Sequence, residues 1–126
     1  MATDTNKASS AISDFINFLT QCGKDFVYYS NEVVTQDKLT QDYLHQIELD
    51  GLNCSERSKI ATKLMANRKK RRESKDMTEI LEPIIKFCAE ENTKRTLNKL
   101  NELLGQVRKV EKYHDNRTYI PRVDKK

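Results

Sequence analysis

The chain has 126 residues, of which 37% are hydrophobic and 33% charged, and this charged fraction exceeds the roughly 25% of typical soluble domains. Only three glycines and two prolines occur, which argues against a turn-rich all-β fold and favours long helices with few connections. The formal net charge of +4 permits an anionic partner but does not require one. Where the charge lies along the chain is therefore more informative than its total.

The N-terminal part of the chain predicts one long helix. Residues 1–8 are polar and expected to be disordered, and Ser9 or Ser10 can cap a helix that follows. Its apolar residues alternate at spacings of three and four, the heptad pattern of helices that pack along one seam. This seam consists of Ile12, Phe15, Leu19, Cys22, Phe26, Tyr29 and Val33. It becomes polar at Gln36 and Thr40.

A short connection leads to a second helix. Gly51 fits the left-handed position at which many helices end, and Asn53 followed by Glu56 fits a capping box that starts the next one. Antiparallel pairing about this connection brings together residues whose numbers sum to about 104. The polar residues expected at the centre of the seam are Asn67, Arg71 and Ser74, with Glu32 and Asp37 beside them.

The second helix contains signals for an interruption. A second capping signal at Asp76 predicts a break or bend near residues 74–76. Pro83 lacks the amide hydrogen of a helical residue and predicts a kink. The signals fit one kinked helix as well as two separate helices, 53–74 and 76–91.

The last helix is expected to be shorter. Asn92 and Thr93 can cap it, and a leucine-rich stripe follows them. Residues 114–126 are expected to form an extended tail, because Pro121 disfavours helical backbone in the residue before it. The predicted fold is all-α: a long antiparallel helical hairpin plus a shorter C-terminal helix, together one domain over residues 9–113.

One segment of the second helix is unusually basic. This basic segment consists of Arg68, Lys69, Lys70, Arg71 and Arg72. Helical residues turn by about 100° each, so its side chains point all round the axis. No large apolar residue lies between Ala66 and Met77. A buried helix cannot carry such a gap unless the charges are paired, solvated or bound to an anion.

Two interpretations of the basic segment remain open. Arginine and lysine suit phosphate oxygens, which favours a polyanion site. No aromatic residue interleaves with the cations and no nucleic-acid-binding motif accompanies them, so nucleic-acid binding would depend on backbone contacts. The alternative is a solvated helix surface that nearby acids partly neutralise. These acids are Glu32, Glu73, Asp76 and Glu79.

Other constellations give weaker signals. Asp42, His45 and Glu48 are spaced by three residues and offer ligands for a divalent metal ion, but no second helix carries matching ligands. His114 and Asp115 suit a base and its orienting carboxylate, yet no nucleophile accompanies them. No Gly-rich phosphate loop or nucleophile motif occurs. We therefore expect no enzymatic activity, no metal and no cofactor.

The cysteines and the lengths of the apolar runs indicate the cellular compartment in which the protein is expected. Cys22, Cys54 and Cys88 form no C-x-x-C pair, which favours reduced thiols in a cytosolic protein. No apolar run approaches the ~20 residues needed to span a bilayer, and the first residues lack the order of a signal peptide. We expect a cytoplasmic protein without a membrane segment.

Two segments within residues 55–123 resemble sequences of a known class of small proteins. ERSKIATKLMANRKKRRESKDM and LLGQVRKVEKYHDNRTYIPRV are similar to small helical accessory proteins of bacteriophages of Gram-positive bacteria. The shared pattern is an Arg/Lys-rich helix, a short Leu-rich helix and an R-x-Y-x-P-R-V tail. The resemblance implies a protein of the bacterial host cytosol that binds a host or defence component, including by anti-CRISPR-type inhibition. It carries no active-site motif and transfers no site residue.

The sequence therefore predicts non-catalytic binding of an anionic partner through the basic segment. The expected partner is nucleic acid, a nucleoprotein, or a host or defence protein that handles nucleic acid. One alternative is a homodimer or larger assembly built on the heptad seam. Another is a protein that sequesters a small phosphorylated ligand in a pocket lined by Asn67, Arg71 and Ser74, with Glu32 or Asp37 opposite.

Overall fold

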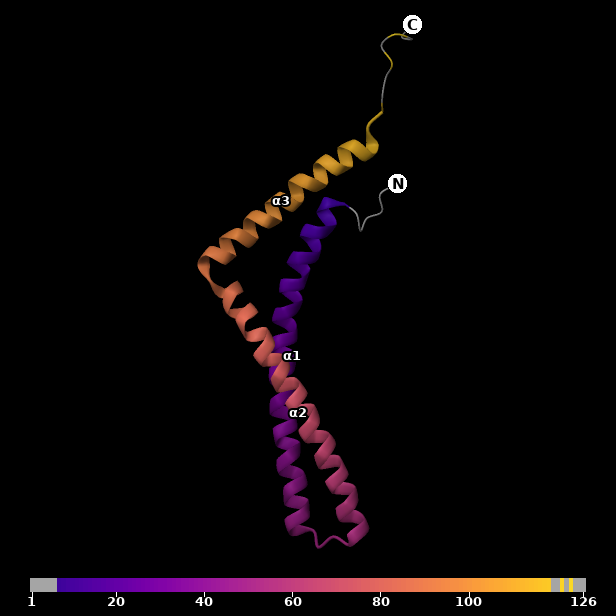
Figure 1. The fold of residues 1–126 in the computed structure, drawn as a ribbon, viewed down its shortest axis with the longest axis vertical. Helices are drawn as coiled ribbons and strands as arrows, with labels where there is room; N and C mark the ends of the chain where they lie inside the picture. The colour runs from indigo at the N-terminus through magenta and orange to yellow at the C-terminus, as the bar shows by residue number, and fades with distance from the viewer. Residues whose placement is uncertain (1–6, 119–120, 122, 124–126) are drawn as a thin grey trace. The chain divides into compact units, whose positions relative to one another are not determined.

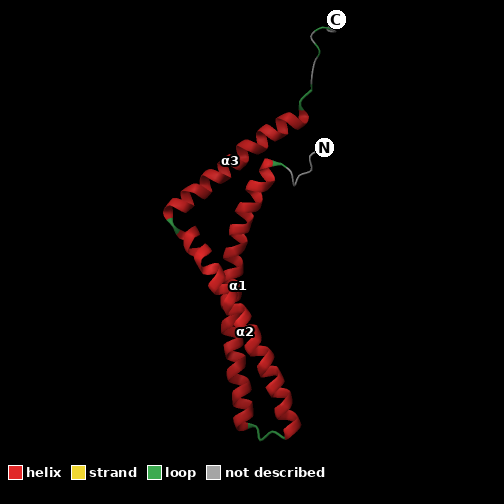
Figure 2. Ribbon diagram, in the orientation of Figure 1, coloured by secondary structure: helices red, strands yellow, loops and turns green. Residues whose placement is uncertain are grey.

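The structure is a computed structural model that describes residues 7–118, 121 and 123. These residues form three α-helices and no strand (Figures 1 and 2): α1 (Ala8–Leu49), α2 (Cys54–Ala89) and α3 (Glu91–Asn116). The all-α prediction is confirmed, with two long helices and a shorter third one. The segment expected to be disordered was residues 1–8, and residues 1–6 of it lie outside the described residues. Tail residues 119–120, 122 and 124–126 lie outside them as well.

The helices belong to two compact units. One unit joins the start of α1, through Phe18, with α3, and the other spans Leu19–Ala89 and contains the rest of α1 with all of α2. The sequence led us to expect one helical domain over residues 9–113. The second unit is the antiparallel hairpin, and it contains the whole basic segment.

The turn of the hairpin forms as its sequence predicts. The Asp50 amide donates to the Gln46 carbonyl at 3.1 Å, and Gly51 follows with a φ of 54°. The Asn53 side-chain oxygen then accepts from the Glu56 amide at 2.8 Å, which caps the first turn of α2. Figure 1 shows this loop joining α1 to α2, which run side by side above it.

The predicted break near residues 74–76 is wrong, because α2 is continuous from Cys54 to Ala89 with Pro83 inside it. Ser74 is buried, so this part of α2 packs on α1 instead of ending there. Pro83 removes one helical hydrogen bond, but Leu81 is buried just before it and Ile84 is half-buried just after. Packing on both sides of the proline outweighs its local preference.

Both predicted ends of α3 need correction. The helix starts at Glu91, and its N-cap residue, Glu90, makes no side-chain capping hydrogen bond, so Asn92 and Thr93 are not the cap. Thr93 is buried because it faces the packed side of α3. At the other end α3 continues to Asn116, so residues 114–116 are helical and not part of the extended tail. An ion pair of 3.0 Å between Asp115 and Lys7 stabilises this last turn.

Polar side chains are prominent in the core. The buried hydrophobic residues among those described are Cys22, Leu81 and Leu104, and the buried polar residues are Ser9, Gln36, Asn67, Ser74 and Thr93. Most members of the heptad seam are only half-buried. The helices are therefore held in place by polar contacts as well as by apolar burial.

Two of the three glycines, Gly51 and Gly23, provide a test of the hairpin turn. Gly51→Ala places a Cβ on left-handed backbone, so we expect the free energy of unfolding to fall by about 1 kcal/mol. Gly23→Ala, inside α1 with no atom within 4 Å of the new Cβ, is expected to raise it by about 0.5–1 kcal/mol. Urea unfolding followed by circular dichroism measures both. Equal stability of the two variants would contradict the turn geometry.

Candidate functional site

A buried amide contact aligns the two helices of the hairpin. Asn67 Nδ2 of α2 donates to the backbone oxygen of Gln36 at 2.8 Å and to its side-chain oxygen at 2.7 Å. The Thr40 hydroxyl donates to Asn67 Oδ1 at 2.6 Å. Gln36 and Asn67 are both only 5% exposed. The pairing of residue 36 with residue 67 agrees with the register expected from the sequence.

The polar seam residues predicted around this contact do come together. Ser74 is 4% exposed, and Arg71 is half-buried with its guanidinium on Asp37 at 2.5 Å. Glu32 accepts from Gln36 Nε2 at 2.8 Å. The α1–α2 interface thus contains Asn67, Arg71, Ser74, Glu32 and Asp37, and among them Arg71 binds Asp37 directly.

Two residues of the basic segment, Lys70 and Arg71, form ion pairs with acidic residues of α1. Lys70 Nζ lies 3.0 Å from Glu32 Oε1, and Arg71 is bound to Asp37. The hydrogen bond from Lys70, followed by that from Gln36, lowers the pKa of the Glu32 carboxyl below its ordinary value. The same contact raises the pKa of the Lys70 ammonium. Lys70 and Arg71 therefore serve the helix–helix contact.

The rest of the basic segment faces solvent. The side chains of Arg68 and Arg72 are 50% and 64% exposed, and their ion pairs, with Asp37 and Asp76, are 4.0 Å long. Lys69 is exposed and has no ion-pair partner in the described part of the chain. Such long, solvated pairs contribute little to stability. These three cations remain available to an external anion.

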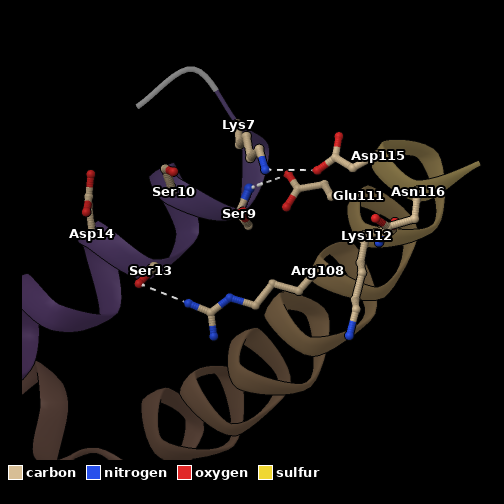
Figure 3. A pocket seen from close by; sticks show the side chains of 10 residues that line it. All are labelled: Lys7, Ser9, Ser10, Ser13, Asp14, Arg108, Glu111, Lys112, Asp115 and Asn116. Atoms are coloured by element: carbon tan, nitrogen blue, oxygen red, sulfur yellow. Dashed lines mark hydrogen bonds and ion pairs between the residues drawn. The ribbon is translucent and has the colours of Figure 1, made fainter. Parts of the chain in front are cut away.

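The unit formed by α3 and the start of α1 contains an open cleft of about 570 Å³. Figure 3 shows how its polar groups face one another: Glu111 accepts from the Ser9 backbone amide at 3.1 Å, and Lys7 contacts Asp115 at 3.0 Å. Hydrogen bonding from Ser9 lowers the pKa of the Glu111 carboxyl. Glu111 thus satisfies an amide that the first turn of α1 leaves without a helical partner.

This cleft was not expected from the sequence. Ser9 and Glu111 are 102 residues apart, and no local pattern links them. The available signal was the pair of acids Glu111 and Asp115, which lie one helical turn apart and face the same side. The cleft holds the start of α1 against α3, because its anionic and cationic groups already bind each other.

The weaker sequence candidates do not form a site. Asp42, His45 and Glu48 are all exposed on α1. In the described residues, no three side chains of His, Cys, Asp or Glu gather closely enough to hold a metal ion. His114 stacks edge-on against Tyr113, with ring centres 5.3 Å apart, while Asp115 binds Lys7. The pair expected from the sequence is therefore separated.

Comparisons with protein families, curated proteins and solved structures give no match to this chain. Within the described helices, none combines the length and apolar character needed to cross a membrane.

The Glu32 contact predicts a pH dependence of stability. Because the folded-state pKa of Glu32 lies below its ordinary value of 4.5, its carboxylate stabilises the hairpin above that pH. The contribution is lost as the pH falls through the lowered pKa. We expect Glu32→Gln to melt at a lower temperature than the parent protein at pH 7, with the difference shrinking below pH 4.5.

Thermal melts across pH 3–7, followed by circular dichroism, test this prediction. Glu48→Gln, which changes an exposed carboxylate on the same helix, should melt like the parent at every pH. A difference between Glu32→Gln and the parent that persists unchanged in acid would contradict the assignment.

Proposed function

We propose that this protein binds nucleic acid non-catalytically, through phosphate contacts made by Arg68, Lys69 and Arg72. The observation that carries the proposal is the exposure of these three cations on adjacent turns of α2. Glu73 is the only acidic residue from Lys63 to Lys75, and the carboxylates of Asp37 and Asp76 reach Arg68 and Arg72 only at 4.0 Å. A polyphosphate backbone is the common biological anion that can engage several such groups at once.

The hairpin contributes to this surface by orienting α2. The ion pairs of Lys70 with Glu32 and of Arg71 with Asp37 fix the rotation of the helix about its axis. Lys69 and Arg72 make no ion pair with α1 in the described residues, whereas the half-exposed Arg68 guanidinium lies beside Thr40 and Asp37 of α1. Arginine and lysine contacts to phosphate carry no base information, so binding through them is expected to be largely independent of sequence.

The resemblance to phage accessory proteins supports a related partner. A host or defence protein that handles nucleic acid, as in anti-CRISPR-type inhibition, also offers anionic surfaces to these cations. Nuclease treatment would distinguish such a partner. A host or defence protein that this chain contacts directly would stay bound to it after all nucleic acid has been digested.

Neutralising the three exposed cations provides the test. Arg68→Gln, Lys69→Gln and Arg72→Gln are combined, because glutamine keeps a long side chain and adds no repulsion toward Asp37 and Asp76. We expect weaker binding to labelled DNA and RNA in fluorescence anisotropy. The slope of log K against log salt should become shallower by about 0.7–0.9 for each phosphate that the variant no longer neutralises.

A matched control neutralises Lys94, Arg95 and Lys99, which are exposed on α3. This control should bind like the parent, and both variants should keep the helical circular-dichroism spectrum. Failure of the parent protein to bind DNA or RNA at low salt would reject the proposal, as would equally weakened binding in the two variants.

The second candidate function is self-association into a structural assembly. In the hairpin unit, the exposed large apolar residues include Val27, Tyr28, Val34, Ile80 and Phe87, whereas its buried hydrophobic residues are Cys22 and Leu81. Isolated helices gain most of their stability by burying an apolar face. A second copy covering these residues would bury apolar area that the hairpin alone leaves in water.

Self-association makes a concentration-dependent prediction. We expect light scattering to report a dimer, and the melting temperature to rise with protein concentration. Val27→Gln with Val34→Gln, which changes exposed residues seven positions apart on α1, should shift the mass toward the monomer. Val110→Gln on α3 serves as control. A monomer at every concentration would exclude this candidate.

A further inference from the structure

A shallow groove runs between α1 and α2 beside the buried amide contact. It is lined by Gln36, Leu39, Tyr43, Lys63, Ala66, Asn67 and Lys70 and measures about 290 Å³. Pockets for whole small molecules usually measure about 300–1,000 Å³. The groove is thus at the lower end of this range and has room for one planar ring.

The lining of the groove combines cations with an aromatic ring. Lys63 and Lys70 come from α2, spaced two turns apart, while Tyr43 and Leu39 come from α1. Ala66 is the smallest side chain among them, which leaves space between the two helices. Lys63 has no ion-pair partner among residues 7–118, whereas Lys70 forms an ion pair with Glu32.

The sequence pattern does not predict an aromatic ring beside these lysines. The basic segment has no aromatic neighbour along the chain, but the antiparallel hairpin supplies one from α1. Tyr43 of α1 lines the same groove as Lys63 of α2. Aromatic rings beside cations are the usual elements of single-strand binding surfaces, where a base stacks on the ring and the cations contact phosphate.

The dimensions favour an unpaired base. In a duplex the bases are stacked on each other and paired, so a shallow groove between two helices reaches only the backbone. In a single strand a base can leave its stack and enter the groove.

We propose that the α1–α2 groove accepts an unpaired base of single-stranded nucleic acid, with Tyr43 as the stacking ring and Lys63 as a contact to a flanking phosphate. The inference rests on the proposed function and adds to it a preference for single strands. Arg68, Lys69 and Arg72 supply the phosphate contacts common to all nucleic acids, and the groove supplies the contact to a base.

The test compares three labelled probes of equal length: oligothymidine, the same strand made entirely of abasic sites, and a duplex. Fluorescence anisotropy at fixed salt measures each affinity. Base–aromatic stacking predicts that the parent binds oligothymidine at least about fivefold more tightly than the abasic strand. Tyr43→Leu should remove this difference, Tyr43→Phe should keep it, and Lys63→Gln should make the salt slope for oligothymidine shallower by about 0.7.

Tyr113→Leu is the control, since Tyr113 is an exposed tyrosine of α3. It should preserve the preference for oligothymidine. Circular dichroism checks that Tyr43→Leu remains helical. If it unfolds, the parent protein's comparison of oligothymidine with the abasic strand decides the question, because that comparison needs no variant.

The outcomes separate the two proposals. Equal affinity of the parent for oligothymidine and the abasic strand overturns the groove inference, while the salt-dependent contribution of Arg68, Lys69 and Arg72 still stands. Absence of binding to every probe at low salt overturns both.

Discussion

The contact of Asn67 with Gln36 and Thr40 is the constraint on which the hairpin depends. A buried amide must find partners for its donors and acceptor, and each unsatisfied group costs about 1–3 kcal/mol. A slip of one turn between α1 and α2 would leave several of these groups without partners. Apolar side chains alone tolerate such a slip more easily, and the hairpin buries few of them. The polar contact therefore selects the register.

The selected register determines what the basic segment can do. With Gln36 opposite Asn67, Glu32 and Asp37 form ion pairs with Lys70 and Arg71. Arg68 lies at the edge of the interface beside Thr40 and Asp37, and Lys69 forms no ion pair in the described residues. The neutralised surface expected from the sequence is thus present at Lys70 and Arg71, and the anion site is proposed for Arg68, Lys69 and Arg72.

Local chemistry explains which parts of the structure were predictable from sequence. The turn at Gly51, the cap at Asn53 and the hairpin register follow from short patterns. The break predicted near Asp76 was wrong because burial of Ser74 and Leu81 outweighs a local capping signal. The contact of Glu111 with Ser9 and the groove beside Tyr43 were missed, since both bring together residues that are distant along the chain.

Nucleic-acid binding and self-association would compete only if a second copy packed on the centre of α2. A second copy packed there would bring two basic segments together, which like-charge repulsion disfavours unless an anion lies between them. The exposed apolar residues Val27 and Val34 lie on α1 instead, outside the basic segment. Self-association through α1 would consequently leave Arg68, Lys69 and Arg72 accessible. Nucleic-acid binding through α2 and assembly through α1 are therefore compatible in one molecule, and assembly would multiply the phosphate contacts available to a single strand.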